Sequence, residues 1–188
     1  MTTLRCFVFD LDDVLLPTTE LFSKPTVRNA LARTPVYNDN DVFRLYHSFV
    51  HPNLALTQAL HRIHSPKFIL TNASRAHANA SLRALCIQQY FTGQLDANSG
   101  YAIKPNIQIY QAMHNHITRN VIRRYNTSSV QILFFDDKVE NLIEPRLLGW
   151  TTVWIYGNTF SHNQPLPSFI QYSFQTIEHA LQFFTLQQ

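Results

Sequence analysis

Short apolar runs alternate with amphipathic stretches along most of the chain. The first run begins at Phe7, is rich in aromatic and β-branched residues, and ends in the carboxylates of Asp10, Asp12 and Asp13, which predicts a buried strand. Further strands are predicted at residues 67–70, 129–135 and 150–156. Helices are predicted at residues 25–34, 42–50, 52–63, 75–86, 107–117, 139–148 and 174–186. This alternation predicts an α/β fold with a parallel sheet and right-handed crossovers.

Residues 17–63 interrupt the alternation, because they carry helical patterns and no strand pattern. A helical insertion directly after the first strand is expected to lie over the functional edge of the sheet. We therefore predict two units. Residues 1–16 and 64–188 form a Rossmann-like, three-layer α/β/α core around a parallel sheet, and residues 17–63 form a small helical cap.

Composition limits the classes of protein and of site. The chain has 188 residues, of which 45% are hydrophobic and 14% charged, as expected for one globular domain. Its 4 glycines exclude a glycine-rich phosphate loop, so any phosphate must be bound by other groups. The 9 histidines form no spaced set of zinc ligands. Cys6 and Cys86 are predicted to be buried free thiols, which are typical of a reducing compartment.

The net charge of +3 results from few acids rather than many bases. The densest basic cluster, Arg119, Arg123 and Arg124, is interpreted as a solvated helix face rather than a nucleic-acid surface. No signal peptide or membrane span is visible in the sequence. We therefore expect a cytoplasmic protein, a monomer or small homo-oligomer, that acts on a small anionic substrate without nucleic-acid or membrane partners.

Reactive polar side chains lie at several predicted strand ends. They are Asp10 and Asp12 after the first strand, Thr71 and Asn72 after the second, Lys104 before a helix, and Asp136 and Asp137 after the long apolar strand. Because ligands of open α/β sheets bind outside the carboxyl ends of the strands, these groups are expected to share one site. Each of them alone has an ordinary explanation as a helix cap, a turn or a surface residue. Only the joint pattern favours a functional site.

The set suits phosphoryl transfer, which requires a nucleophile, neutralisation of phosphate charge and a proton for the leaving group. Asp10 is the candidate nucleophile, since a carboxylate can form an acyl phosphate. Asp12, two residues further on, is the candidate acid and base. Mg²⁺ is the predicted cofactor, with Asp10, Asp12 and Asp137 as its ligands, because this cation prefers oxygen. The candidate phosphate-binding residues are Thr71, Asn72 and Lys104.

These motifs resemble those of the haloacid dehalogenase-like superfamily. The matching segments are Phe9-Asp10-Leu11-Asp12-Asp13-Val14, Leu70-Thr71-Asn72, Lys104-Pro105 and Phe134-Phe135-Asp136-Asp137-Lys138-Val139-Glu140-Asn141. The resemblance covers nearly the whole chain and implies the same roles, with the backbone carbonyl of Asp12 as its Mg²⁺ ligand. It implies supporting roles for Asp136, at a position that varies between acid and glycine, and for Asn141. Many members have a second acid in place of Asn141, which weakens the case for a direct metal contact.

Asp12 favours phosphate esters as substrates, because dehalogenases of this superfamily lack an acid here and a halide leaving group needs no proton. The segment Leu70–Ala73 with His77, and Phe134–Lys138 with Asn141, further resemble the pyrimidine 5′-nucleotidase branch. The lead hypothesis is a Mg²⁺-dependent phosphomonoester hydrolase that forms an aspartyl phosphate. Its substrate is a small phosphometabolite, with nucleoside 5′-monophosphates as one candidate class.

The cap leaves two questions open. Its aromatic residues could stack a base, although packing of the cap onto the core is the favoured interpretation; they are Phe22, Phe43, Tyr46 and Phe49. The short cap and Asn141 also motivate an alternative function, in which the protein keeps the fold as a binding or regulatory protein with little catalysis.

Overall fold

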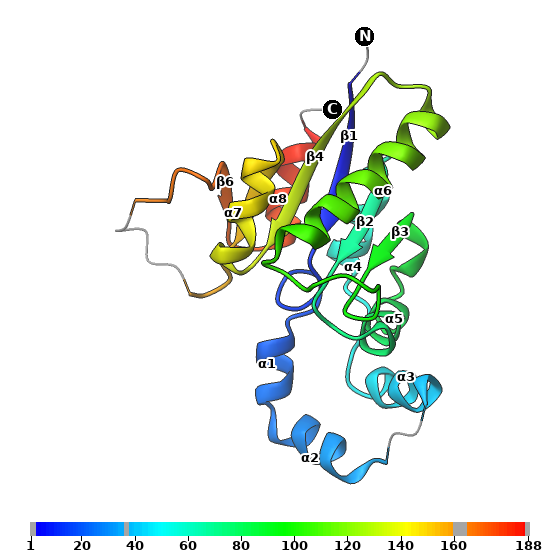
Figure 1. The fold of residues 1–188 in the computed structure, drawn as a ribbon. Coiled ribbons are helices and arrows are strands. Elements are labelled where there is room, and N and C mark those ends of the chain that lie inside the picture. Colours follow the sequence, from blue (N-terminus) through cyan, green and yellow to red (C-terminus); the bar gives the residue numbers. More distant parts are fainter. Residues whose placement is uncertain (1–2, 36–37, 160–164, 187–188) are drawn as a thin grey trace.

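The computed structural model describes residues 3–35, 38–159 and 165–186. These residues form one sheet of six strands, in the order β3-β2-β1-β4-β5-β6, and every neighbouring pair is parallel. The strands are β1 (Thr3–Phe9), β2 (Lys67–Leu70), β3 (Gly93–Leu95), β4 (Ser129–Asp136), β5 (Thr151–Ile155) and β6 (Tyr172–Phe174). Helices cover both faces of this sheet (Figure 1). The predicted three-layer α/β/α architecture is therefore confirmed.

The α-helices follow the apolar periodicity of the sequence. They are α1 (Thr18–Ser23), α2 (Pro25–Arg33), α3 (Asp39–His47), α4 (Leu54–Arg62), α5 (Arg75–Ala84), α6 (Ile107–Tyr125), α7 (Ile143–Leu147) and α8 (Ile177–Thr185). Two short 3₁₀ helices are η1 (Gln88–Tyr90) and η2 (Val139–Leu142). None of the described helices combines the length and apolarity that a membrane span requires.

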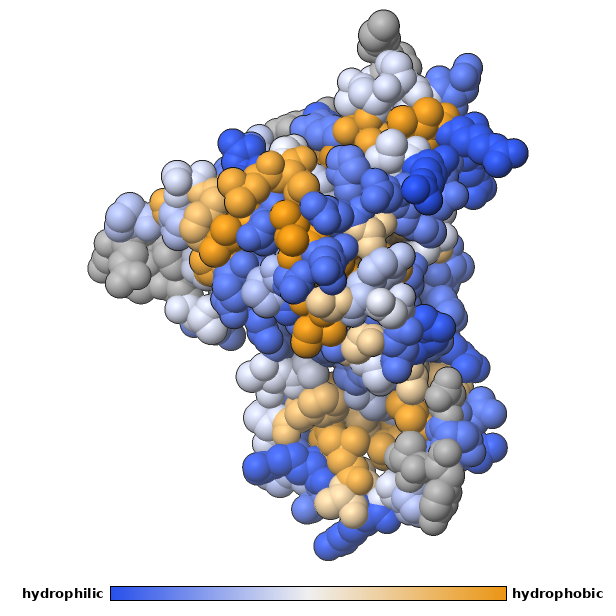
Figure 2. Space-filling view, viewed as in Figure 1, coloured by the Kyte–Doolittle hydropathy of each residue, from blue (hydrophilic) through white to orange (hydrophobic). Residues whose placement is uncertain are grey.

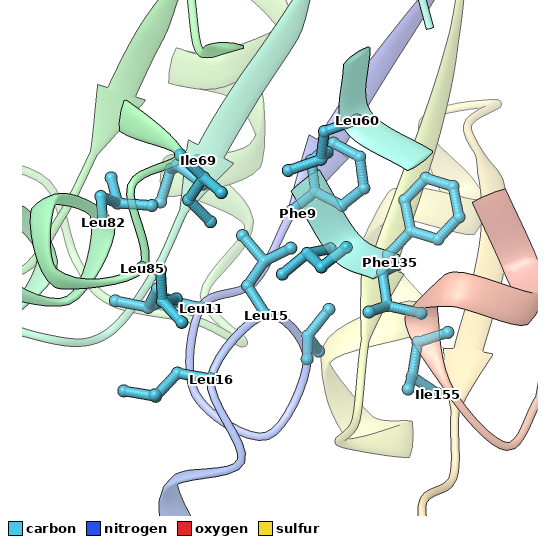
Figure 3. Packing of buried hydrophobic residues seen from close by; sticks show 14 of the residues in the cluster. Phe9, Leu11, Leu15, Leu16, Leu60, Ile69, Leu82, Leu85, Phe135 and Ile155 are labelled. Carbon is cyan, nitrogen blue, oxygen red and sulfur yellow. The ribbon is translucent and has the colours of Figure 1, made fainter. Parts of the chain in front are cut away.

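Two apolar layers flank the sheet, because alternate residues of a strand point to opposite faces. Phe9 of β1 and Phe135 of β4 belong to the layer that packs against α4, α5 and α8, and their ring centroids are 4.9 Å apart. Figure 3 shows both rings beside Leu60 of α4. Val8 and Phe134 belong to the other layer, which packs against α6. Burial on both faces makes β1 and β4 a rigid support for the residues that follow them.

Helices α1 to α3 lie beyond the carboxyl ends of the central strands, at the opposite end of the molecule from the N-terminus (Figure 1). Helix α3 packs against α5, where the guanidinium of Arg83 lies 3.9 Å from the ring centroid of Phe43. Helix α4 instead packs against α8, and the Asn53 side-chain amide donates to Glu178 at 2.8 Å. The cap boundary at residue 63 stays a prediction. Helix α4 lies within the predicted cap, residues 17–63, but it contacts α8 of the core.

Three short elements, η1, β3 and β6, were not predicted from the sequence, and β6 ends at Phe174, where the last helix was predicted to begin. Helix α1 lies within the helical insertion predicted at residues 17–63. Both strands lie at edges of the sheet and have only three residues each. Three residues are too few to show an alternating pattern in the sequence.

The prediction that Cys86 is buried is wrong, whereas Cys6 is buried as expected. Cys86 follows the last turn of α5 and has a φ of 56°. This left-handed conformation ends the helix, which displaces the residue from the buried face that the helical periodicity assigned to it.

Asp96 is a buried carboxylate that organises the loop after β3. It accepts hydrogen bonds from Arg75 Nε at 3.0 Å, Gln94 Nε2 at 2.8 Å, the Asn98 amide at 2.9 Å and the Ser99 hydroxyl at 3.1 Å. Burial opposes ionisation, but these donors together hold the pKa of Asp96 below its ordinary value. The carboxylate form is therefore stabilised by folding.

We expect Asp96→Asn to lower the free energy of unfolding by about 2 kcal/mol at neutral pH, because a neutral amide accepts fewer of these bonds. The pKa of Asp96 is lower in the folded chain, so its contribution is complete above the unfolded value of about 3.9 and is lost as pH falls through the folded value. Urea unfolding should show the difference from wild type shrinking below about pH 4.

The control is Glu20→Gln, which removes an exposed ion pair with Lys24 and should change stability little. A difference between Asp96→Asn and wild type that is the same at acidic and neutral pH would contradict this prediction.

Candidate functional site

The carboxyl ends of β1, β2 and β4 meet at one edge of the sheet. Phe9 lies opposite Ile69 of β2 and Phe135 of β4 in the parallel ladder. The amide of Asp10 donates to the carbonyl of Phe135 at 2.9 Å. The residues at these strand ends therefore lie side by side. Asp10 and Thr71 directly follow β1 and β2, and Asp136 is the last residue of β4.

Lys104 links two buried carboxylates at this edge. Its Nζ lies 2.9 Å from Asp10 Oδ1 and 2.7 Å from Asp136 Oδ2. Asp10, Asp136 and Asp137 each offer a carboxylate oxygen, and these oxygens lie within 4.8 Å of one another. One buried ammonium group thus faces three carboxylates. The resulting excess of negative charge fits a divalent cation, which would compensate the cost of burying these groups.

Asp136 and Asp137 differ in what their oxygens contact. Asp136 Oδ1 accepts hydrogen bonds from the Lys138 amide and from Asn141 Nδ2, both at 2.9 Å, and its Oδ2 accepts from Lys104. Asp137 Oδ1 is buried and has no hydrogen-bond partner among the described residues. Asp136 is therefore suited to anchoring Lys104, whereas the unpaired oxygen of Asp137 is suited to binding a cation.

Asn141 supports this arrangement without needing to contact a metal. Its side chain is buried, donates to Asp136, and sits in η2, while its carbonyl accepts from the hydroxyl of Tyr110 at 2.9 Å. The amide therefore supplies a donor to Asp136 at a place where a carboxylate would add a repulsive charge.

The pKa values reflect uncompensated burial of these acids. Burial, with the neighbouring charge of Asp136, raises the pKa of Asp10 to about 7, although Lys104 opposes the shift. Burial and Asp136 also raise the pKa of Asp137 to about 6. Burial lowers the pKa of Lys104, but Asp10 and Asp136 outweigh this effect and raise it above the ordinary value. A cation bound among these oxygens would favour the ionised carboxylates.

Asp12 lies in a tight turn between β1 and α1. The amides of Leu15 and Leu16 donate to the carbonyl of Leu11, and the turn is closed by a hydrogen bond from the Asp13 amide to Leu16. Asp12 Oδ1 accepts from the Thr18 hydroxyl at 2.6 Å and lies 2.8 Å from His77 Nε2. Burial raises the pKa of Asp12, but these two partners outweigh it and hold the value below the ordinary range.

Asp13, the third acid of the first motif, points elsewhere. It has a φ of 57° and accepts hydrogen bonds from the amide and hydroxyl of Thr19, at 2.8 and 2.6 Å. Its carboxylate therefore stabilises the beginning of α1.

Thr71 and Asn72 lie next to the acidic cluster in different ways. The Thr71 hydroxyl accepts from the amide of Ala73 at 3.1 Å. The Asn72 side chain forms a pair of hydrogen bonds with the backbone of Lys104, accepting from its amide at 2.8 Å and donating to its carbonyl at 2.9 Å. Asn72 thereby fixes the segment that carries Lys104. Its phosphate-binding role stays a prediction.

Two residues at this site were missed as contributors. Tyr46 of α3 and His77 of α5 form a hydrogen-bonded chain to Asp12, with Tyr46 OH 2.5 Å from His77 Nδ1. His77 had been noticed only through the resemblance of its segment, and Tyr46 only as an aromatic residue. No spacing in the sequence links them, because they are 31 residues apart and meet only where α3 packs on α5.

The aromatic residues of the cap pack mainly against one another. Ring centroids of Phe22 and Tyr46 are 6.1 Å apart, those of Phe22 and Phe49 are 6.2 Å apart, and those of Tyr46 and Phe49 are 5.4 Å apart. Figure 2 shows apolar side chains gathered on the cap face between α1 and α3. Phe22 of α1, Leu31 of α2 and Val42 of α3 are among the partly buried apolar residues of this region. Contacts between the cap and the core come from Tyr46, which packs on His77, and from Phe43, which lies under Arg83, both on α5.

No protein-family model and no curated protein matches the sequence, so the comparison rests on structures. A protein assigned as a β-phosphoglucomutase from Thermotoga maritima has a TM-score of 0.67 at 15% identity, covering 97% of this chain and 99% of its own. A HAD phosphatase from Thermococcus onnurineus has a TM-score of 0.64 at 14% identity, covering 96% and 98%. A HAD hydrolase from Bacillus subtilis, bound to magnesium, has a TM-score of 0.60 at 14% identity, covering 97% and 99%.

L-2-haloacid dehalogenases are also similar in structure, at 9% to 16% identity. All these proteins match over nearly their whole length, so the similarity includes the sheet, its flanking helices and the insertion after β1. At identities this low, the structural similarity establishes the fold but not the activity. The chain therefore has the haloacid dehalogenase-like fold.

Proposed function

We propose that the protein is a Mg²⁺-dependent phosphomonoester hydrolase that acts through an aspartyl phosphate on Asp10. The observation that carries the proposal is the pairing of two differently placed carboxylates. Asp10 is buried beside Lys104 at the end of β1, and Asp12, two residues later, is half-exposed in the turn that leads to the cap. This difference supports assigning Asp10 as the group that attacks phosphorus and Asp12 as the group that exchanges protons with the leaving group and water.

In the first step, an oxygen of Asp10 forms a bond to phosphorus while the bond from phosphorus to the ester oxygen breaks. Asp12, which must be protonated at the start of this step although its pKa is low in the free chain, passes its proton to that leaving oxygen and becomes a carboxylate. In the second step, Asp12 takes a proton from water, which attacks the aspartyl phosphate and releases inorganic phosphate and free Asp10. Lys104 stabilises the negative charge of the phosphoryl group throughout.

Mg²⁺ would be held by the carboxylates of Asp10 and Asp137 and by the backbone carbonyl of Asp12, where it would neutralise phosphate charge. The unpaired oxygen of Asp137 and the raised pKa of Asp10 and Asp137 support this assignment. The magnesium bound to the similar Bacillus subtilis hydrolase supports it as well.

Phosphate esters are favoured over haloacids because Asp12 supplies an acid that a halide leaving group does not need. His77 and Thr18 hold this acid in place, which would serve no purpose in dehalogenation. We propose a small phosphometabolite as substrate. Nucleoside 5′-monophosphates remain one candidate class, on the motif resemblance alone, since the cap aromatics contact one another.

The test is a substrate screen with nucleoside 5′-monophosphates, sugar phosphates and 4-nitrophenyl phosphate, in which released phosphate is measured. We expect turnover with Mg²⁺ and none in excess EDTA, because the carboxylate cluster cannot bind the phosphate dianion without a cation. The same preparation should release no chloride from 2-chloropropionate. Absence of phosphate release across the panel would contradict the proposal and support the binding or regulatory alternative.

A further inference from the structure

A chain of hydrogen bonds connects the cap to the proposed acid of the site. Tyr46 OH lies 2.5 Å from His77 Nδ1, and His77 Nε2 lies 2.8 Å from Asp12 Oδ1. The three residues belong to α3 of the cap, α5 of the core and the turn after β1. Tyr46 is 6% exposed, so its hydroxyl is directed into the molecule rather than to solvent.

The direction of each hydrogen bond follows from its end groups. An ionised Asp12 can only accept, so Nε2 of His77 carries the proton and donates it. When the imidazole is neutral, the other ring nitrogen, Nδ1, has a free lone pair and accepts from the Tyr46 hydroxyl. The two contacts, one at each ring nitrogen, hold the imidazole in one orientation.

The position of the Asp12 side chain depends on these hydrogen bonds. Both of its hydrogen bonds, from His77 and from the Thr18 hydroxyl, end on Oδ1, so Oδ2 is the oxygen left for proton transfer. His77 itself is firmly placed, because it lies in the first turn of α5, where Ser74 caps its amide at 3.2 Å. By contrast, Tyr46 reaches His77 from α3, a helix of the predicted cap that packs on α5.

We propose that His77 is a positioning residue for Asp12, and that the Tyr46 hydroxyl makes this positioning depend on the docking of cap helix α3. This inference rests on the proposed phosphomonoesterase function. A docked cap aligns His77, and His77 directs the carboxyl group of Asp12 toward the leaving oxygen. Proton transfer to the leaving group is then efficient only when α3 is seated on α5.

The experiment compares 4-nitrophenyl phosphate with phenyl phosphate, which have the same ring but differ in the basicity of the leaving oxygen. Nitrophenolate leaves without a proton, whereas phenolate depends on one. We expect His77→Ala to reduce kcat/KM for phenyl phosphate about tenfold more than for 4-nitrophenyl phosphate. This tenfold difference is a fraction of the rate enhancement that general acid catalysis supplies. Tyr46→Phe should show the same selectivity to a smaller extent.

Two amide variants test the roles of the two ring nitrogens of His77 separately. His77→Gln places an amide near the position of Nε2 and can still donate to Asp12, so it should recover most of the loss with phenyl phosphate. His77→Asn places its amide near Nδ1, reaches only toward Tyr46, and should behave like His77→Ala. The control is His51→Ala, an exposed histidine outside the site, which should leave both rates unchanged.

A second measurement does not depend on turnover. Nitrogen-15 spectra of histidine-labelled protein should show a proton on His77 Nε2, with the Nδ1 resonance shifted by Tyr46→Phe. Equal losses for the two phosphates in His77→Ala, with no recovery in His77→Gln, would show a purely structural role and overturn the inference while sparing the proposed function. Absence of turnover in the wild type would overturn the proposed function, and with it this inference.

Discussion

Replacement of Asp10 by Asn is expected to abolish turnover while the fold survives. The amide cannot attack phosphorus, so kcat should fall by about 10⁴-fold or more, as for removal of other covalent nucleophiles. Stability should be kept, because burial already raises the pKa of this carboxyl to about 7 and the folded chain holds a neutral group there more readily than a carboxylate. Phosphate release and urea unfolding measure the two effects.

A matched control for this variant lies in the same turn. Asp13→Asn removes a charge three residues away whose hydrogen-bond partner is Thr19 and which acts on the cluster only through its charge, by raising the pKa of Asp137, so it should lose at most a few-fold in kcat. In the wild type, acid-quenched protein should carry phosphate on the peptide that contains Asp10. Undiminished activity in Asp10→Asn would rule out the nucleophilic mechanism.

Replacement of Lys104 by Met is expected to damage both stability and activity. The ammonium group contacts Asp10 and Asp136, and all three side chains are almost fully buried. Its removal leaves two buried carboxylates without their cation, which should lower the free energy of unfolding by about 3 to 5 kcal/mol. Activity should fall as well, because the phosphoryl group loses a positive charge.

A double variant tests whether the loss of stability in Lys104→Met is caused by the missing positive charge. Lys104→Met combined with Asp136→Asn removes one of the stranded carboxylates and should recover part of the lost stability, which isolates the coupling between the two sites. Unfolding is followed in EDTA by the fluorescence of buried Trp150 and Trp154, so that no divalent cation compensates for the missing lysine. Lys138→Met, at an exposed neighbouring lysine, should change stability by less than about 0.5 kcal/mol. Wild-type stability in Lys104→Met would contradict the prediction.

Much of the fold was predictable because its signals are local. Apolar runs of four to eight residues in β1, β2 and β4 mark strands that are buried on both faces, and such runs differ clearly from the helical periodicity around them. The edge strands β3 and β6 were missed because three residues carry no pattern. Their pairing is decided by the neighbouring strands β2 and β5.

The sequence predicted which strand ends meet at the candidate site, but not which side chains contact one another there. Parallel strands bring their carboxyl ends to one edge, so Asp10, Thr71 and Asp136 had to lie near one another. The sequence could not show that Asn72 fixes the backbone of Lys104 or that Asn141 donates to Asp136. Those contacts depend on the path of the loops between the strands.

By itself, the sequence determined that the carboxylate of Asp10 would follow a buried strand, with Asp12 two residues beyond it, because both features follow from neighbours along the chain. Only the tertiary structure decided how Asp12 is held. Its partner His77 is 65 residues away, and the Tyr46 hydroxyl behind it comes from another helix. Such a chain of hydrogen bonds exists only where α3 packs on α5, since helix packing sets the distances between residues that the sequence leaves unrelated.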